Sequence, residues 1–283
     1  MSAFRRMPTA FGPFPGPRQT SSGAPHTTWS ASTHRTVSVV FTTTAAVLRT
    51  FLPNSSFTLD VPGDIGYASL CITHLANLPW LAGRGYNHYG LYIHGVVCTS
   101  AGETIRGKYL VALWEDLADP ILSGREELGY AKLYAELKEH HDEEAGAYTL
   151  SASWLGKEFG TLELSGLDAE VTGAGSKSTE FEAGEGLLHY KYIPRTGRPG
   201  EADAEYATFT PAAKEGTTVV ERELIAKKAS FAFNSRSWEE LPTLFHIVQK
   251  LEMMKPLEVI RASVVWGTGL SDLREHRIVG NLE

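Results

Sequence analysis

The sequence contains few cysteines and no long apolar segment. Among its 283 residues only Cys71 and Cys98 are cysteines, and they do not form the close pair that is typical of a metal or redox site. We therefore expect two buried thiols in a reducing, cytoplasmic setting. No stretch approaches the roughly 20 consecutive apolar residues that cross a bilayer, so we expect no membrane partner.

The chain also lacks an excess of positive charge. It carries 26 Lys and Arg residues against 33 Asp and Glu residues, which gives a formal net charge of -7. Nucleic-acid-binding domains usually concentrate basic residues on one face, so this balance argues against a nucleic-acid partner. A small molecule is the expected partner, and an apolar content of 42% is enough for a sizeable core.

Several common site motifs are missing. Neither a P-loop nor a G-x-S-x-G elbow is present, and residues 267–272 lack the third spaced glycine of a dinucleotide-binding loop. Residues 140–144 place two histidines beside acidic residues, but no further ligand motif completes a metal site, so we interpret them as a solvated turn. We expect neither a metal nor an organic cofactor.

Acidic residues are absent before Asp60, and the segment preceding it is rich in Ser, Thr, Pro and Arg. One interpretation is a transit peptide, which has this composition. The other is an ordered arm, in which the aromatic and proline residues at 11–17 pack over a pocket at little entropic cost. We favour the second, with an N-terminal Pro/Ser/Thr-rich arm at residues 1–35 and a single domain at residues 36–283.

Strands dominate the predicted elements. Short apolar or alternating runs between turn formers predict strands at residues 36–41, 67–74, 90–98, 108–114, 148–155, 160–164, 187–193 and 217–226. Helical patterns are expected at residues 44–52, at 120–128 and from Pro242 to just before Pro256. The acidic segment from Glu115 to Pro120 is interpreted as a turn. The pattern predicts a β-rich α+β fold with a few covering helices.

Residues 124–134, Gly-Arg-Glu-Glu-Leu-Gly-Tyr-Ala-Lys-Leu-Tyr, contain a lysine among mostly apolar neighbours. Gly129 would cost a continuous helix about 1 kcal/mol relative to alanine, which favours a helix before it and a strand after it. On such a strand Lys132, Tyr134 and Glu136 would share one face.

This segment resembles the lysine segment of the acetoacetate decarboxylase family, which reads G-R-E, a spacer ending in proline, and two adjacent lysines. Lys132 takes the place of the family's Schiff-base lysine, while Ala131 replaces the proline and Leu133 replaces the second lysine. The resemblance runs from about Thr36 to residues 256–260. It implies an acetoacetate decarboxylase-like core, an antiparallel β-barrel or sheet, and a homo-oligomer.

The resemblance also implies other site residues. The family's pocket glutamate falls at His88, within Tyr-Asn-His-Tyr-Gly-Leu-Tyr-Ile at residues 86–93. A histidine of ordinary pKa could transfer protons there. The remaining candidates are groups that would position the lysine or bind substrate: Ser69 at the place of a second glutamate, Arg35 (or the adjacent His34) at that of a substrate-binding arginine, and Arg125 with Glu126 as a buried pair beside the lysine.

A lysine of ordinary pKa near 10.4 is protonated at neutral pH and cannot attack a carbonyl group. Burial or a neighbouring cation lowers that pKa. Because Leu133 supplies no charge, we expect burial among Tyr130, Leu133 and Tyr134 to activate Lys132.

The predicted function is that of a carbon–carbon lyase without a cofactor, in which Lys132 forms a Schiff base with a β-keto acid or a related ketone. Two alternatives remain. The same iminium could serve an aldolase, a dehydratase or a cyclase acting on a larger, polyketide-like ketone. In the second alternative the lysine stays protonated and the protein is a non-catalytic small-molecule binder.

Overall fold

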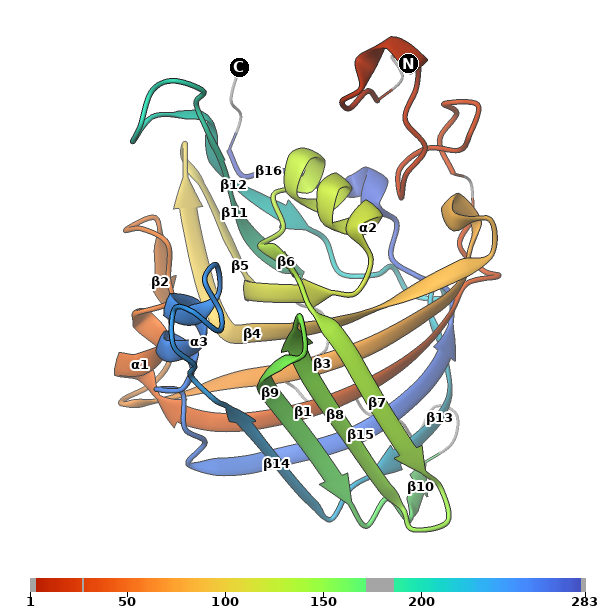
Figure 1. Cartoon of the computed structure of the whole chain (residues 1–283), viewed down its shortest axis with the longest axis vertical. Coiled ribbons are helices and arrows are strands. Elements are labelled where there is room, and N and C mark those ends of the chain that lie inside the picture. Colours follow the sequence, from red (N-terminus) through yellow and green to blue (C-terminus); the bar gives the residue numbers. More distant parts are fainter. Residues whose placement is uncertain (1–3, 27, 172–185, 281–283) are drawn as a thin grey trace.

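The structure, a computed structural model, describes residues 4–26, 28–171 and 186–280. Its strands form two sheets (Figure 1). The large sheet contains β1 (Thr33–Thr44), β2 (Phe57–Leu59), β3 (Ile65–Leu78), β4 (Arg84–Ser100), β5 (Glu103–Glu115), β6 (Lys132–Tyr134), β10 (Ala169–Val171), β11 (Leu187–Pro194), β12 (Ala202–Thr210), β13 (Val219–Ile225), β15 (Glu258–Thr268) and β16 (Arg277–Ile278). The small sheet contains β7 (Glu136–Asp142), β8 (Ala147–Trp154), β9 (Lys157–Ser165) and β14 (Lys228–Phe233).

The large sheet is mostly antiparallel and open. Its strands follow the order β10-β13-β15-β1-β3-β4-β5-β11-β12-β16, with β2 on β4 and β6 on β5, and the small sheet has the order β14-β9-β8-β7. Two pairings are parallel, those of β5 with β6 and with β11. Since β10 and β16 are ends of the order, the strands of the described residues form a sheet core and not a closed ring.

The core lies between the two sheets. Tyr89 of β4 and Trp114 of β5 are fully buried and contact Phe233 of β14, with ring centroids 6.2 and 6.0 Å away. Trp114 also packs against Phe159 of β9 at 5.6 Å. These aromatic rings remove large apolar areas from water, and Figure 1 shows the small sheet crossing the long central strands on this side.

The alternate residues of the same strands point the other way. Successive side chains of a strand project to opposite faces, so Thr73, His88 and Glu115 lie on the face that the core does not use. That second face lines a cavity, and strand alternation therefore provides a core and a site from one set of strands.

Short helices accompany the sheets. They are α1 (Ala45–Arg49), α2 (Ala118–Ser123) with the one-turn π-helix η3 (Gly124–Leu128), α3 (Phe245–Leu251), and the 3-10 turns η1 (Thr9–Phe11), η2 (Pro79–Leu81) and η5 (Leu273–Glu275). In Figure 1 the α2 segment lies above the central strands, away from the small sheet. Within the described ranges no helix has the length and apolarity needed to cross a membrane.

The predicted strands and helices are confirmed, with shifts at their ends. The last helix begins at Phe245 and not at Pro242, because the preceding residues form turns. Two interpretations are wrong. His140 and His141 lie in β7, so only the residues after Asp142 form a turn. Glu115 is the buried last residue of β5, and not the first residue of a turn.

Candidate active site

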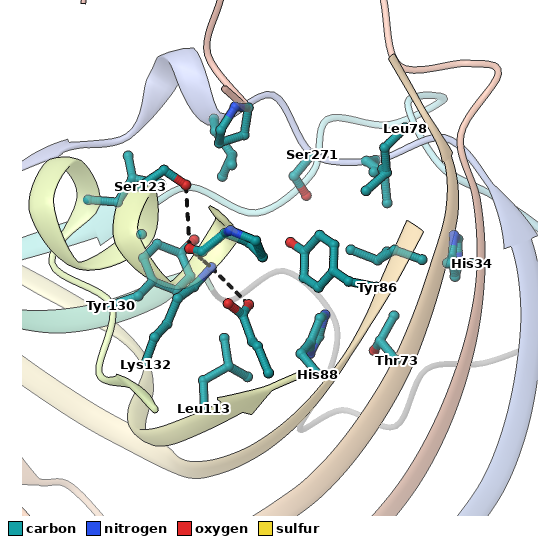
Figure 2. Close-up of a pocket in the computed structure, with 18 of the residues that line it drawn as sticks. His34, Thr73, Leu78, Tyr86, His88, Leu113, Ser123, Tyr130, Lys132 and Ser271 are labelled. Carbon is teal, nitrogen blue, oxygen red and sulfur yellow. Dashed lines mark hydrogen bonds and ion pairs between the residues drawn. The ribbon is translucent and has the colours of Figure 1, made fainter. Parts of the chain in front are cut away.

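A cavity of about 320 Å³ opens on the face of the large sheet opposite the core. Strands β1, β3, β4 and β5 supply one wall, and α2, η3 and β6 supply another. Gly269, Leu270, Ser271 and Leu273 also line it, as do two residues of the N-terminal segment, Pro17 and Trp29. Figure 2 shows Lys132, Tyr130, Tyr86 and His88 around the same space.

Lys132 reaches this cavity because of how η3 ends. Gly129 adopts a left-handed conformation with φ of 77°, which closes the π-helix and turns the chain into β6. Strand β6 then pairs in parallel with β5, placing Lys132 beside Leu113. A Cβ atom on Gly124 would lie only 2.4 Å from the Lys132 Cε atom, so the glycine provides room for the lysine side chain.

The Lys132 amine is buried and held by two oxygen atoms. Its Nζ atom lies 2.8 Å from Oε1 of Glu115 and donates a hydrogen bond of 2.9 Å to the carbonyl oxygen of Pro120. Lys132 is 7% exposed and Glu115 is fully buried. The two charges form an ion pair shielded from water, which strengthens their interaction.

Burial pushes both members of this pair toward their neutral forms. Desolvation lowers the pKa of Lys132 below its ordinary value, although the Glu115 carboxylate opposes that change. Desolvation likewise raises the pKa of Glu115, against the opposing charge of Lys132. A proton can therefore pass from the amine to the carboxylate without leaving a bare charge in the cavity, which makes a nucleophilic amine accessible.

His88 lines the same cavity but does not have an ordinary pKa. Burial in the cavity wall, assisted by the charge of Lys132, lowers its pKa to about 3. His88 is consequently neutral at pH 7 and a weak base, and its buried Nδ1 atom has no hydrogen-bond partner among the described residues. Burial raises the pKa of Glu115, and its carboxylate lies 2.8 Å from the Lys132 amine, so Glu115 is the better placed group for proton transfer.

The residues proposed for substrate binding lie outside the cavity. Ser69 is buried and shares a 2.9 Å hydrogen bond with His94. Arg35 forms an ion pair with Glu139 of β7, while its neighbour His34 lines the cavity. Of this group, only the alternative position His34 therefore adjoins the space around Lys132.

The expected buried pair of Arg125 and Glu126 is not what the structure shows. Both side chains are exposed, because η3 points them away from the cavity. Arg125 donates a 2.8 Å hydrogen bond to the main-chain carbonyl oxygen of Lys132, and it lines a separate cavity of about 270 Å³ with Leu133. Arg125 thus contacts the lysine strand from behind.

The residues that bury Lys132 also differ from those expected. Tyr130 lines the cavity, with its ring centroid 5.4 Å from the Lys132 Nζ atom. Leu133 faces the second cavity, and Tyr134 is 42% exposed. Tyr134 is therefore not among the residues that bury Lys132, and it does not line the cavity; β6 ends at this residue.

Sequence reasoning missed Glu115, the charged partner of the lysine. The one signal in the sequence is strand alternation: Leu113 and Glu115 are two residues apart in β5 and share a face. That signal does not say what this face contacts. Only the parallel pairing of β5 with β6 brings that face to Lys132, 17 positions later in the chain. In the described part of the chain, no three His, Cys, Asp or Glu residues cluster as metal ligands would.

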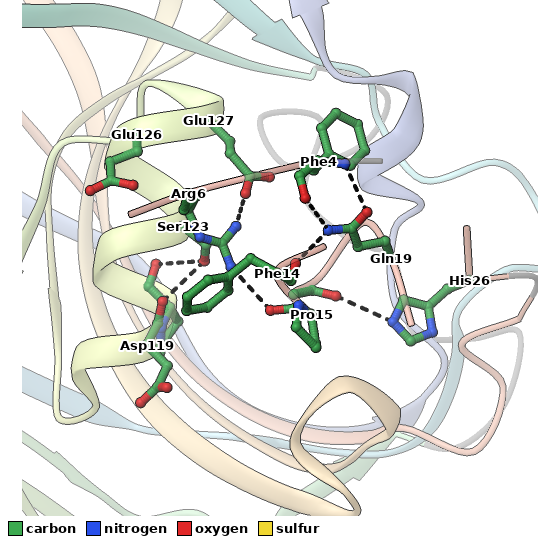
Figure 3. A network of polar contacts seen from close by, with 12 residues as sticks. Phe4, Arg6, Phe14, Pro15, Gln19, His26, Asp119, Ser123, Glu126 and Glu127 are labelled. Atoms are coloured by element: carbon green, nitrogen blue, oxygen red, sulfur yellow. Dashed lines mark hydrogen bonds and ion pairs between the residues drawn. The ribbon is translucent and has the colours of Figure 1, made fainter. Parts of the chain in front are cut away.

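The N-terminal segment lies against α2 and η3 (Figure 3). Arg6 forms an ion pair with Glu127 of η3 and donates a 3.0 Å hydrogen bond to the Pro15 carbonyl oxygen. The Gln19 side-chain amide bonds both main-chain polar groups of Phe4, at 2.9 and 2.8 Å. These bonds fix a folded-back segment whose Pro17 reaches the cavity.

A family model described as acetoacetate decarboxylase (ADC) matches residues 6–270 of the chain. Among solved structures, one from structural studies of acetoacetate decarboxylase has a TM-score of 0.64 at 13% identity and covers 93% of this chain and 95% of that chain. An acetoacetate decarboxylase-like enzyme from Sphingomonas wittichii RW1 has a TM-score of 0.57 at 13% identity and covers 92% and 96%.

A third structure is the enduracididine biosynthesis enzyme MppR, complexed with the condensation product of pyruvate and imidazole 4-carboxaldehyde. It has a TM-score of 0.61 at 12% identity and covers 89% of each chain. No curated protein sequence matches this chain significantly. At these low identities the structural matches show a shared fold.

Proposed function

The chain belongs to the acetoacetate decarboxylase family, and from that premise we propose that it is a Schiff-base-forming lyase acting on a β-keto acid or a related ketone through Lys132. The observation that carries the proposal is the buried Lys132 amine, which faces a ligand-sized cavity 2.8 Å from the Glu115 carboxylate. Burial lowers the pKa of such an enclosed amine, which favours the neutral form that a nucleophile requires.

The first chemical step follows from this geometry. Glu115 takes a proton from the Lys132 amine, and the Nζ lone pair attacks the carbonyl carbon of the substrate. The nitrogen loses its remaining extra proton while the former carbonyl oxygen gains two and leaves as water, giving a C=N bond. Glu115 is placed to supply one of those protons, and its carboxylate then faces the iminium cation.

The iminium next accepts an electron pair from a bond at the adjacent carbon. If that bond joins a carboxylate, carbon dioxide leaves and an enamine remains. Protonation of the enamine carbon and addition of water then release the product and restore the free amine. The Pro120 carbonyl oxygen, 2.9 Å from Nζ, holds the amine in position between turnovers.

Reductive trapping tests the proposal. Incubation with a ketone and borohydride, followed by peptide mapping, should label Lys132 and leave Lys132→Ala unlabelled. Lys191 is a matched internal control, because it is 9% exposed and bonds the Glu126 carbonyl oxygen outside the cavity. Turnover of a ketone without any adduct at Lys132 would sink the Schiff-base mechanism.

Two other functions share the same cavity. Aldol, dehydration or cyclisation chemistry would use the same iminium, and the condensation product bound to MppR makes this reaction class worth testing here. Measuring the release of carbon dioxide from simple β-keto acids distinguishes decarboxylation from these other reactions. The Lys132–Glu115 ion pair would keep the amine protonated in a non-catalytic binder. Such a protein would bind a ketone without forming an adduct at Lys132.

A further inference from the structure

The charges that line the cavity cancel. Among its described lining residues, Lys132 is the single Lys or Arg and Glu115 is the single Asp or Glu. Burial lowers the pKa of His34 and lowers that of His88 to about 3, so both histidines are neutral at pH 7. A ligand therefore enters a space without a net charge.

The nearby arginines are bound elsewhere. Arg6 pairs with Glu127, and Arg35 pairs with Glu139. Arg125 bonds the Lys132 carbonyl oxygen from behind the strand, and Arg18 lies 4.1 Å above the ring of Phe4. None of these guanidinium groups lines the cavity. The position at which the family places a substrate-binding arginine thus offers no cation to a ligand here.

A carboxylate would be poorly accommodated in this cavity. Removing an ionised carboxylate from water is costly unless a charge or several hydrogen bonds replace the lost water. The Lys132 charge is already compensated by Glu115, and it disappears when the iminium precursor, the free amine, forms. When Glu115 holds the proton that the amine has lost, neither group carries a charge that could attract an anion.

The remaining walls favour apolar groups. Rings of Trp29, Trp80 and Tyr92 face the space, together with Leu75 and Leu78. Aromatic and branched side chains of this kind bind apolar ligand groups by burying their surface. A volume of about 320 Å³ is sufficient for a ketone that carries one aromatic ring or a branched alkyl chain.

We infer that the substrate which Lys132 binds is an uncharged ketone or aldehyde bearing an aromatic or branched apolar group, and not a free keto acid. This inference rests on the proposed function for its covalent step. Decarboxylation requires a carboxylate on the substrate, so an uncharged substrate directs the iminium to aldol or dehydration chemistry.

Matched ketones test the inference. The neutral probe is 4-phenylbutan-2-one, and its charged counterpart is 4-(3-oxobutyl)benzoate. The rate of borohydride-dependent labelling at Lys132 should be at least about tenfold higher for the neutral ketone at pH 7.5. Equal labelling, or faster labelling by the carboxylate, would overturn the inference and leave the Schiff base intact.

A pair that cannot form an imine separates the two claims. The alcohols 4-phenylbutan-2-ol and 4-(3-hydroxybutyl)benzoate, compared by calorimetry, should show at least about tenfold tighter binding of the neutral compound. If the neutral alcohol binds more tightly while no ketone labels Lys132, the proposed function fails and the preference for uncharged ligands stands. Equal affinity for the two alcohols contradicts the preference.

Glu115→Gln provides the residue-level test. Removal of the carboxylate that compensates the Lys132 ammonium should narrow the ratio of the affinities for the neutral and the charged alcohol by at least about threefold. Glu223→Gln is the control, since Glu223 is 3% exposed but pairs with Arg261 away from the cavity. An unchanged ratio in Glu115→Gln would show that Glu115 does not select against anions.

Discussion

Lys132 and Glu115 control each other's titration. The carboxylate raises the pKa of the amine, the ammonium lowers the pKa of the carboxyl group, and desolvation acts against both charges. Neither residue has a second charged partner within the described lining of the cavity. We therefore expect a substitution of one residue to change the pKa of the other.

Glu115→Gln should shift the pH dependence of imine formation. The substitution removes the charge that raises the pKa of Lys132, so the amine deprotonates at lower pH. We expect the midpoint of the borohydride-labelling rate to move toward acid by at least about one pH unit, even if the maximal rate falls. A midpoint that stays in place or moves toward alkali would contradict this. Glu223→Gln should leave it unchanged.

Lys132→Met should destabilise the fold in a pH-dependent way. It leaves Glu115 buried alone, which raises the carboxyl pKa further above its ordinary value of 4.5. A group whose pKa is raised in the folded state contributes stability that is present below its unfolded-state pKa and is lost as pH rises through its folded-state pKa. The free energy of unfolding of Lys132→Met should therefore be only slightly below that of wild type near pH 4.5, and about 3 kcal/mol below it at pH 8.

Urea denaturation of wild type and Lys132→Met at both pH values measures this deficit. The double variant Lys132→Met with Glu115→Leu should recover part of the loss, since no buried charge remains. Equal deficits at acidic and alkaline pH would show that an uncompensated Glu115 is not the cause.

At the scale of single residues, the sequence predicts Lys132 as the proposed nucleophile but does not predict its partner Glu115. The spacing of Gly124, Arg125 and Glu126 from Lys132 marks the lysine through a family resemblance. The contact of Glu115 with Lys132 depends on a parallel strand pairing, which leaves no local pattern in the sequence. The pKa of His88 likewise depends on burial, which its neighbours along the chain do not specify.

Among the elements, η3 and β6 act as one support for the lysine. Gly124 lies where a methyl group would overlap the Cε and Nζ atoms of Lys132, at 2.4 and 2.7 Å. The position of the Lys132 side chain therefore depends on the absence of a Cβ atom at Gly124, eight residues earlier in the chain.

Gly124→Ala should displace the lysine amine from Glu115 and slow imine formation. We expect the labelling rate to fall at least about tenfold, equivalent to about 1.4 kcal/mol. Gly160→Ala is the control, because its new Cβ atom would meet Ala152 at an ordinary contact distance of 3.5 Å. Unaltered labelling in Gly124→Ala would show that the side chain relocates without loss of reactivity.

The N-terminal segment should contribute to ligand retention through its anchor on η3. Arg6→Ala removes the ion pair with Glu127, whose two side chains are 5% and 11% exposed. We expect the Kd for 4-phenylbutan-2-one to rise about tenfold, or about 1.4 kcal/mol. Fluorescence titration measures the change, and the exposed neighbour Arg5 provides the control variant Arg5→Ala. Identical affinities would mean that the segment does not retain the ligand.

Element prediction succeeded for apolar runs bounded by turn formers, but it did not find β12, β14 and β15, and it interpreted the end of β7 as a turn. The strand β7 contains Glu136, Lys138 and Glu139, and its charges resemble those of a solvated turn. It is a strand nonetheless, because it pairs with β8 and its Glu139 bonds Arg35 and the Tyr148 hydroxyl. Tertiary partners of this kind compensate charges that the local sequence leaves unexplained.

For the whole molecule we predict self-association. Met253, Leu257 and Ile260 are between 41% and 60% exposed around the link from α3 to β15, and exposed apolar residues close in the chain often mark an interface. Light scattering after size exclusion should give a multiple of the monomer mass, and Leu257→Glu should reduce it. Leu155→Glu, at an exposed turn, is the control. A monomeric mass for the wild-type protein would contradict self-association. Cytoplasmic localisation is a separate prediction that the structure does not test.

One sheet that carries a core on one face and a cavity on the other has an evolutionary consequence. Substitutions at Thr73 or Tyr92 alter the cavity without removing core contacts, whereas those at the alternate positions Ile72 and Leu91 empty the core. Random libraries at the first pair should thus retain folded variants far more often than libraries at the second. Such a scaffold can acquire new substrates through drift on one face while inheriting its stability from the other.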